Sequence, residues 1–100
     1  MMDLAGKTVL LTGASKGIGA EIAIAIGAAG ANLIAHYGSD RSGAERATAA
    51  IAPERVKLIG ADLQDSNAVD RLWQDALSWR GRDDVVINNA AVMRIAGANT

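Results

Sequence analysis

The residues of this chain best suited to chemistry form a glycine-rich segment, residues 12–19, which reads Thr-Gly-Ala-Ser-Lys-Gly-Ile-Gly and follows an apolar run at residues 9–11. Gly13 permits a sharp turn out of a strand, Gly17 allows backbone N–H groups to approach an anion, and Gly19 removes a side chain where a helix packs on the sheet. The first N–H groups of a helix have no partner within it and favour an anion by roughly 0.3 to 2 kcal/mol. The segment therefore predicts a phosphate-binding loop, although an ordinary strand-to-helix turn would also use these glycines.

Two further motifs follow in order: Asp62-Leu63, and then Asn88-Asn89-Ala90. Together with the glycine spacing G-x-x-x-G-x-G, they resemble the short-chain dehydrogenase/reductase family, and the pattern is similar to that of the 3-oxoacyl-carrier-protein reductases. The resemblance covers residues 6–92. It departs from the family at Ala91, where a glycine is usual, and we expect slightly tighter backbone sterics there without loss of the binding site.

The order of the predicted elements favours a parallel sheet. Strands are predicted at residues 7–12, 32–36, 56–60 and 84–88, and helices at 17–29, 42–51 and 66–80. Because crossovers are right-handed, we expect the first two helices on one face of the sheet, the third on the other, and the strand order 3-2-1-4. The predicted fold class is thus α/β, a Rossmann-type doubly wound parallel sheet. Residues 1–100 would form a single NAD(P)-binding Rossmann-like half domain, truncated relative to family members of about 250 residues.

Apolar spacing supports the helices. Ile18, Ile22 and Ile26 recur every fourth residue, and Gly30 supplies a stop, which favours a helix over the strand suggested by local alternation. In the helix at 66–80, an apolar stripe is predicted to face the core and consists of Val69, Leu72, Trp73 and Ala76. Packing is also the favoured explanation for Trp79.

A ligand is expected where the strand order reverses, between the first and fourth strands. Gly13 would lie on one side of this crevice and the asparagines on the other. The resemblance implies that Asn89 and Ala90 approach the ribose of a cofactor, while Asn88 would bond neighbouring backbone and hold the loops. A plain turn is the alternative explanation for the asparagine pair.

The end of the second strand bears on the choice of cofactor. An NAD-binding unit usually has an acidic residue there, about 20 residues past the glycines, which accepts from the ribose 2′-hydroxyl. This chain has His36-Tyr37-Gly38-Ser39 instead. Lys16 and Arg41 could pair with a 2′-phosphate, each contributing roughly 1.5 to 3 kcal/mol. We therefore predict NADP, with NAD as the second choice; in the alternative, Asp40 binds the ribose and both cations are surface charges.

Asp62 and Leu63 resemble the family's adenine contact, in which the carboxylate accepts from the exocyclic amine and the neighbouring residue covers the ring. Helix capping explains Asp62 equally well and is favoured for Asp65 and Ser66. His36 is the only histidine and is more typical of a satisfied structural residue than of a catalyst or ligand. The full set of candidate cofactor-binding residues is Gly13, Ser15, Lys16, Gly17, Ile18, Gly19, His36, Ser39, Arg41, Asp62, Leu63, Asn89 and Ala90.

No catalytic residue is predicted in this chain. The resemblance implies a catalytic Ser and a Tyr-x-x-x-Lys beyond the region covered here, whereas the single tyrosine, Tyr37, precedes Arg41 by four residues. A guanidinium cannot relay a proton. We expect the parent protein to be an NADP-dependent oxidoreductase acting on a small-molecule carbonyl or alcohol, and the chain alone to be inactive. A non-catalytic nucleotide-binding or scaffold module is the alternative.

Composition sets the remaining expectations. Half of the residues are hydrophobic, the formal net charge is −1 and cysteine is absent. There is no electrostatic case for nucleic acid or an anionic membrane, and no disulfide, cysteine-ligated metal or other metal site is predicted. The absence of a signal segment or a membrane-length apolar run predicts a cytoplasmic location. An open apolar edge at residues 85–87 predicts a homo-oligomer.

Overall fold

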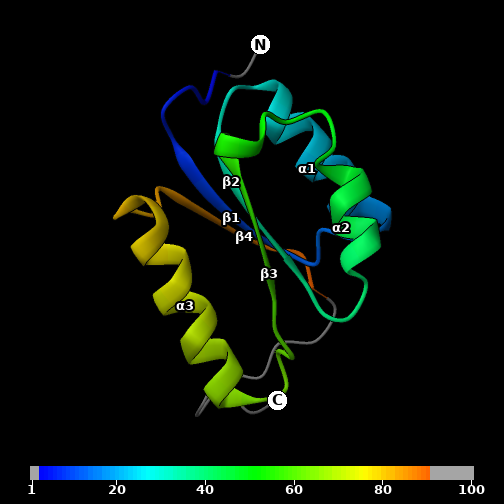
Figure 1. Cartoon of the computed structure of the whole chain (residues 1–100), viewed down its shortest axis with the longest axis vertical. Helices are drawn as coiled ribbons and strands as arrows, with labels where there is room; N and C mark the ends of the chain where they lie inside the picture. The colour runs from blue at the N-terminus through cyan, green and yellow to red at the C-terminus, as the bar shows by residue number, and fades with distance from the viewer. Residues whose placement is uncertain (1–2, 91–100) are drawn as a thin grey trace.

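The computed structural model describes residues 3–90. Its elements are β1 (Thr8–Thr12), α1 (Gly17–Ala28), β2 (Asn32–Tyr37), α2 (Arg41–Ala47), the 3-10 turn η1 (Pro53–Arg55), β3 (Val56–Gly60), α3 (Ser66–Arg80) and β4 (Val85–Asn88). The strands form one parallel sheet in the order β3-β2-β1-β4. In Figure 1 this sheet lies between α3 on one side and α1 and α2 on the other. The predicted sheet type and strand order are therefore confirmed.

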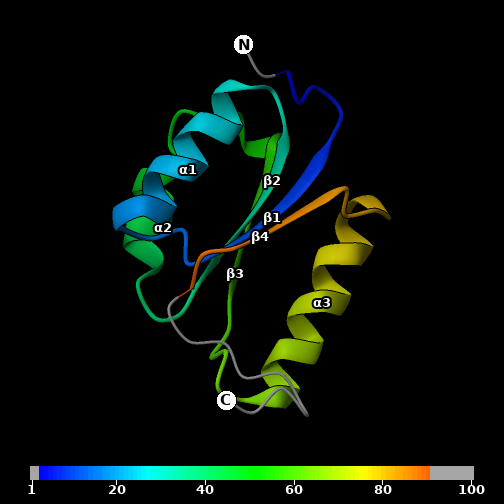
Figure 2. The same ribbon diagram turned by 180° about the vertical axis from the view of Figure 1, so that it is seen from behind.

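Helices cover both faces of the sheet. α1 and α2 lie together on one face, and α3 lies on the other (Figure 2). Every residue of β1 is buried, as expected for a central parallel strand. Val9 and Leu11 pack into the core beneath α1, whereas Leu10 between them packs against Leu72 of α3. The period of two along the strand thus divides the apolar core into two layers.

The strand register brings four loops to one edge of the sheet. Thr12 at the end of β1 lies opposite Asn88 at the end of β4, and Leu11 lies opposite Ala35 in β2. His36 lies opposite Ile59 in β3. Because all the strands are parallel, their carboxyl ends meet at this edge, where sheets of this type bind ligands.

The apolar stripe of α3 is narrower than predicted. Val69, Leu72 and Ala76 are buried, but Trp73 is 38% exposed, so its placement in the core is wrong. Successive helical residues are about 100° apart, and Trp73 therefore lies to one side of the line that faces the sheet. Trp79 packs at the margin of the core, as predicted, with the Arg80 guanidinium 4.5 Å from its ring centroid.

α2 ends at Ala47, before the predicted end at residue 51. The Thr48 hydroxyl donates to the carbonyl of Ala44 at 2.8 Å, and such a bond from a side chain competes with continuation of the helix. Pro53 then begins η1, which the sequence pattern did not predict.

α1 ends near Gly30, as expected. The isoleucines that recur every fourth residue along this helix are not all buried, because Ile26 is buried while Ile18 is 72% exposed.

Candidate cofactor-binding site

The turn from β1 into α1 depends on three glycines. Gly13 and Gly17 have φ angles of +71° and +60°, which residues with a Cβ rarely adopt. A Cβ on Gly13 would lie 3.1 Å from Cα of Ala90, and a Cβ on Gly19 would overlap the carbonyl oxygen of Gly13. Within residues 3–90, and apart from its own chain neighbours and helix backbone, no atom lies within 4 Å of the corresponding position on Gly17. Two glycines therefore permit close packing of backbone, and the third leaves the side of the loop open, which fits the close approach of an anionic ligand.

α1 begins without a side-chain cap. Lys16 occupies the N-cap position, but its side chain makes no capping bond. α2 and α3 differ, because Asp40 accepts from the N–H of Gly43 at 2.9 Å and Asp65 accepts from the N–H of Asn67 at 3.0 Å. The first N–H groups of α1 thus receive no protein anion from their own N-cap, and they can bind an external one.

Thr12 fastens the glycine loop to the end of β4. Its hydroxyl oxygen accepts from the N–H groups of Asn89 at 3.0 Å and Ala90 at 3.2 Å, while the Asn89 side-chain amide donates to the Gly13 carbonyl at 3.0 Å. The prediction gave this holding role to Asn88, and Asn89 performs it instead. Thr12 was missed as a site residue because its partners lie more than 70 residues away along the chain; its place at a buried strand end was the available signal.

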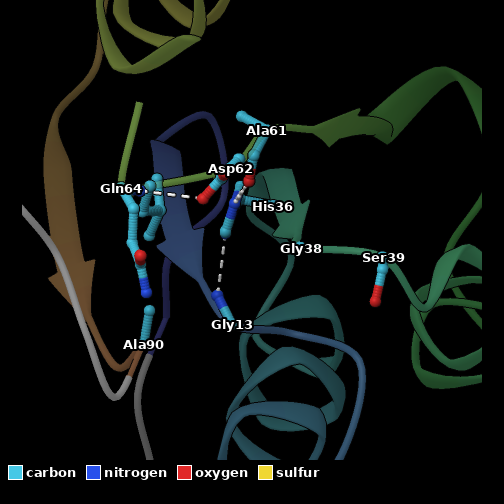
Figure 3. A pocket seen from close by; sticks show the side chains of 9 residues that line it. Gly13, His36, Gly38, Ser39, Ala61, Asp62, Gln64 and Ala90 are labelled. Atoms are coloured by element: carbon cyan, nitrogen blue, oxygen red, sulfur yellow. Dashed lines mark hydrogen bonds between the residues drawn. The ribbon is translucent and has the colours of Figure 1, made fainter. Parts of the chain in front are cut away.

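His36 joins the ends of β1, β2 and β3. Its Nδ1 accepts from the N–H of Gly13 at 3.1 Å, and its Nε2 donates to the carbonyl of Ala61 at 2.9 Å (Figure 3). The backbone N–H can only donate, so the ring is the neutral tautomer protonated at Nε2. Burial lowers the pKa of His36, and the hydrogen bond to the Ala61 carbonyl partly opposes this shift. This is the satisfied structural environment predicted for a lone histidine.

A cavity of about 500 Å³ opens beside these strand ends (Figure 3). It brings together six of the predicted residues, namely Gly13, His36, Ser39, Asp62, Leu63 and Ala90. Gly38, Ala61 and Gln64 complete the lining and were not predicted. Gln64 directly follows the Asp62-Leu63 motif, and in Figure 3 its side chain extends toward Ala90.

The connection between β3 and α3 supplies several residues that line this cavity. The Asp62 carboxylate accepts from the N–H of Gln64 at 2.9 Å, and the backbone carbonyl of Asp62 accepts from the N–H of Asp65 at 3.0 Å. Asp62 therefore shapes the turn, while Asp65 caps α3 as expected. The capping role predicted for Ser66 is wrong, because Ser66 is the first residue within the helix. Leu63 is buried against the core beneath α3.

The remaining candidates do not line the cavity. Ser15, Lys16, Gly17, Ile18 and Gly19 form the adjoining loop and the first turn of α1. Arg41 begins α2 rather than lying in a loop, and its guanidinium donates to the Tyr37 hydroxyl at 3.1 Å and pairs with Glu45 at 3.3 Å. Ala91 lies outside the described residues. Within residues 3–90, no group of three or more potential metal ligands occurs, and no helix is both long and apolar enough to cross a membrane.

A family model described as short chain dehydrogenase matches residues 7–100. The chain belongs to the short-chain dehydrogenase family. It is 41% identical over 92 residues to 3beta-hydroxysteroid dehydrogenase 1 of Eggerthella lenta, a match that covers 90% of the chain and 35% of that protein. It is 38% identical over 90 residues to glucose 1-dehydrogenase 2 of Bacillus subtilis, covering 88% of the chain and 35% of that protein.

Solved structures of short-chain dehydrogenases superpose closely on this chain. A short-chain dehydrogenase/reductase from Serratia marcescens matches with a TM-score of 0.81 and 33% identity, covering 89% of this chain and 37% of that one. A 3-ketoacyl-(acyl-carrier-protein) reductase from Brucella melitensis, complexed with NADH, matches with a TM-score of 0.80 and 33% identity, covering 90% and 36%. The chain thus spans about a third of the length of the curated relatives and solved structures that it matches.

Proposed function

We propose that this chain is the cofactor-binding part of an NADP-dependent oxidoreductase, in which hydride passes between a nicotinamide and a carbonyl or alcohol carbon. Residues 1–100 would act as a single NAD(P)-binding half domain. The observation that carries the proposal is the junction of β1 and α1, where an uncapped helix N-terminus follows a glycine loop that is open beside Gly17. Family membership supports the reaction class. The narrower similarity to 3-oxoacyl-carrier-protein reductases stays a prediction, supported by the Brucella neighbour.

The proposed roles follow the geometry of the site. The backbone N–H groups from Ser15 to Gly19 would hold the diphosphate, with Lys16 and Ile18 carried on that loop. Asn89 and Ala90 would flank the nicotinamide ribose, while Asp62 and Leu63 would border the adenine; Ala90, Asp62 and Leu63 line the cavity. His36 and Ser39 would lie beside the adenosine ribose. A bound nicotinamide cofactor supplies the hydride, and the residues of this chain bind and orient it.

Two features favour NADP over NAD. First, β2 ends in His36-Tyr37 and has no carboxylate there, and the carboxylate that follows, Asp40, is held by the Gly43 N–H as the cap of α2. Second, the Arg41 guanidinium, a permanent cation, is held at the start of α2 by the Tyr37 hydroxyl at 3.1 Å. The Brucella neighbour complexed with NADH keeps NAD as the second choice.

Calorimetric titration of the chain with NADPH and with NADH tests this function. We expect NADPH to bind more tightly by about tenfold or more, because its 2′-phosphate gains a charge-assisted contact. We also expect no NADPH oxidation with simple carbonyl compounds, since the family's catalytic Ser and Tyr-x-x-x-Lys are not in this sequence. Tighter NADH binding would overturn the choice of cofactor, and failure of both to bind would overturn the binding role itself.

We further propose that the chain forms a homo-oligomer through β4. Within residues 3–90, β4 pairs on one side only, and Val85 and Val86 are 39% and 38% exposed. A cavity of about 330 Å³ beside this edge is lined by apolar residues alone, namely Leu4, Val9, Ile22, Ala25, Ile26, Val85 and Ile87. An apolar strand edge with unpaired backbone groups favours association.

Light scattering after size-exclusion chromatography tests this association. We expect the wild-type chain to elute larger than a monomer and Val86→Lys to shift it toward the monomer, because a charge on an edge strand opposes pairing. Ile24→Lys is the matched control, since Ile24 is 55% exposed but lines a different cavity, with Ala47 and Ile51, and not the one beside β4. A stable wild-type monomer would contradict the proposal. The predicted cytoplasmic location is a separate matter and stays a prediction.

A further inference from the structure

His36 is a buried titratable residue for which the proposed hydride transfer has no use. It is 2% exposed, and it holds the glycine loop by two separate hydrogen bonds. The Gly13 N–H donates to its Nδ1 at 3.1 Å, and the Ala14 N–H donates to its backbone carbonyl at 2.9 Å. On the other side of the ring, Nε2 donates to the Ala61 carbonyl at 2.9 Å. The imidazole is therefore fixed between the glycine loop and the end of β3 (Figure 3).

We propose that His36 is a positioning residue for the glycine loop, and that protonation of its imidazole releases the loop and weakens cofactor binding. The cofactor part of this inference rests on the proposed function. An imidazolium carries a proton on both ring nitrogens. Its Nε2–H could keep the bond to Ala61, but its Nδ1–H would then meet the N–H of Gly13, donor against donor. The Gly13 backbone must move away from the ring to relieve this conflict.

Movement of Gly13 would disturb both the start of α1 and the loop after β4. The carbonyl of the same residue accepts from the Asn89 side-chain amide at 3.0 Å, and its backbone lies directly against Gly19 at the start of α1. A shift of Gly13 therefore changes the packing of both the helix N-terminus and the loop after β4. These are the groups proposed to hold the diphosphate and the nicotinamide ribose.

The charged groups around the imidazole are few. Asp62, after β3, is the other titratable residue that lines the cavity, and its carboxylate accepts from the Gln64 N–H. The cavity lining from β1 and from the loop after β4 consists of Gly13 and Ala90, which carry no charge. Burial is the main cause of the pKa shift of His36, and the hydrogen bond to the Ala61 carbonyl opposes it.

Charged residues also begin each neighbouring helix. Lys16 precedes α1 on the glycine loop, and Asp65 precedes α3, where it is bonded to an N–H of its own helix. At the start of α2, Asp40 likewise caps its own helix and Arg41 is bonded to the Tyr37 hydroxyl. The three bonded side chains are thus committed to partners other than the imidazole.

The direction of the pH effect follows from the pKa shift. Burial lowers the pKa of His36 in the folded chain below the ordinary value of 6.5, so the unfolded chain binds more protons in the interval between the two values. The contribution of the neutral ring to stability is complete above the unfolded pKa and declines as pH falls toward the folded pKa. Cofactor affinity should fall in the same direction, because the neutral ring is the form that accepts from Gly13.

The matched variant is His36→Asn. The Oδ1 of asparagine is as many bonds from Cα as the Nδ1 of histidine, so it can accept from the Gly13 N–H, and it does not titrate. Binding of NADP⁺ is measured from about pH 8 to about pH 5 for both proteins. Each dissociation constant is compared with its own value at the upper limit: we expect the wild-type constant to rise about tenfold for each pH unit below the pKa of His36, while the variant lacks this rise. The titration of the ligand itself is common to both proteins and cancels in their ratio.

If the ratio of the wild-type dissociation constant to that of His36→Asn does not change with pH, the proposed effect of His36 protonation is wrong. Asp62→Asn must retain the pH dependence of the wild type, and its loss in that variant would assign the effect to Asp62. His36→Leu, which removes the acceptor, should bind about tenfold more weakly at the upper pH, as expected for one buried donor left unpaired. Wild-type affinity in His36→Leu would contradict the positioning role.

A readout without cofactor separates this inference from the proposed function. In the ligand-free chain, the NMR signal of the Gly13 N–H should shift with pH along the same curve as the ring protons of His36. If the two curves differ, the positioning role is wrong whether or not NADP⁺ binds. If the curves agree but NADP⁺ does not bind at the upper pH, the positioning role stands, and the proposed function, with the cofactor part of this inference, is wrong.

Discussion

Replacement of Gly19 by alanine is expected to weaken NADPH binding by about 100-fold or more, equivalent to roughly 2.7 kcal/mol. The added Cβ would overlap the carbonyl oxygen of Gly13 and lie 2.5 Å from the side-chain amide of Asn89. Neither group can move freely, because the two are hydrogen-bonded to each other. The first turn of α1 must therefore shift away from the loop, which also costs about 1 to 3 kcal/mol in stability. Calorimetry with NADPH and thermal unfolding measure the two effects.

Gly27→Ala on the same helix is the matched control. Its Cβ would meet the buried side chain of Ile51 and not the backbone of the glycine loop. We expect a loss of stability with NADPH affinity unchanged. Gly13→Ala should weaken binding less than Gly19→Ala, since its Cβ would lie 3.1 Å from the nearest backbone atom, although its φ of +71° adds strain. A folded Gly19→Ala variant that binds NADPH as well as the wild type does would refute the loop geometry.

The second large effect concerns Arg41, whose replacement by glutamine should weaken NADPH binding by about tenfold or more and leave NADH binding unchanged. The guanidinium is held by the Tyr37 hydroxyl at 3.1 Å, so its position is set before a ligand arrives. Loss of one charge-assisted contact to a 2′-phosphate corresponds to roughly 1.5 to 3 kcal/mol. Glu45 lies 3.3 Å from the same guanidinium and competes with the phosphate for it. Parallel titrations with both cofactors measure the change in preference.

Asp40→Ala supplies the comparison, because Asp40 precedes Arg41 and is the alternative ribose ligand. Its carboxylate accepts from the Gly43 N–H at 2.9 Å, so its removal should lower the free energy of unfolding by about 0.5 to 2 kcal/mol. Affinity for NADPH and NADH should then change equally. A selective loss of NADH binding in Asp40→Ala, or an equal loss of both cofactors in Arg41→Gln, would show that the assignment to NADP is wrong.

The sheet was predictable because its signals are local. Each strand is a short apolar run next to a glycine, proline or polar turn, and the handedness of the crossovers then determines the order 3-2-1-4. Helix faces were less predictable. Trp73 and Leu72 are neighbours on the stripe of α3, but only Leu72 meets the sheet, and spacing alone does not give the width of the contact. The early end of α2 depends on the Thr48 hydroxyl, whose competing bond has no periodic signature.

The sequence predicts which loops meet at the candidate site, but it does not predict which hydrogen bonds join them. Gly13 and Asn89 were placed at one crevice by topology, and the structure joins them directly. That Asn89 makes the bonds to the glycine loop expected of Asn88 could not be foreseen, since adjacent residues differ only in which side of the strand end they face. The bonds of His36 to Gly13 and Ala61 connect residues 23 and 25 positions apart, so they require the folded sheet.

A crystal structure of the chain with saturating NADPH tests the central claim most directly. The claim is that the backbone N–H groups from Ser15 to Gly19 bind the diphosphate of a dinucleotide. We expect the diphosphate to lie against these groups beside Gly17, with the adenosine extending past His36 into the cavity next to Asp62. NADPH bound elsewhere, or a glycine loop filled by the protein's own side chains, would contradict the account.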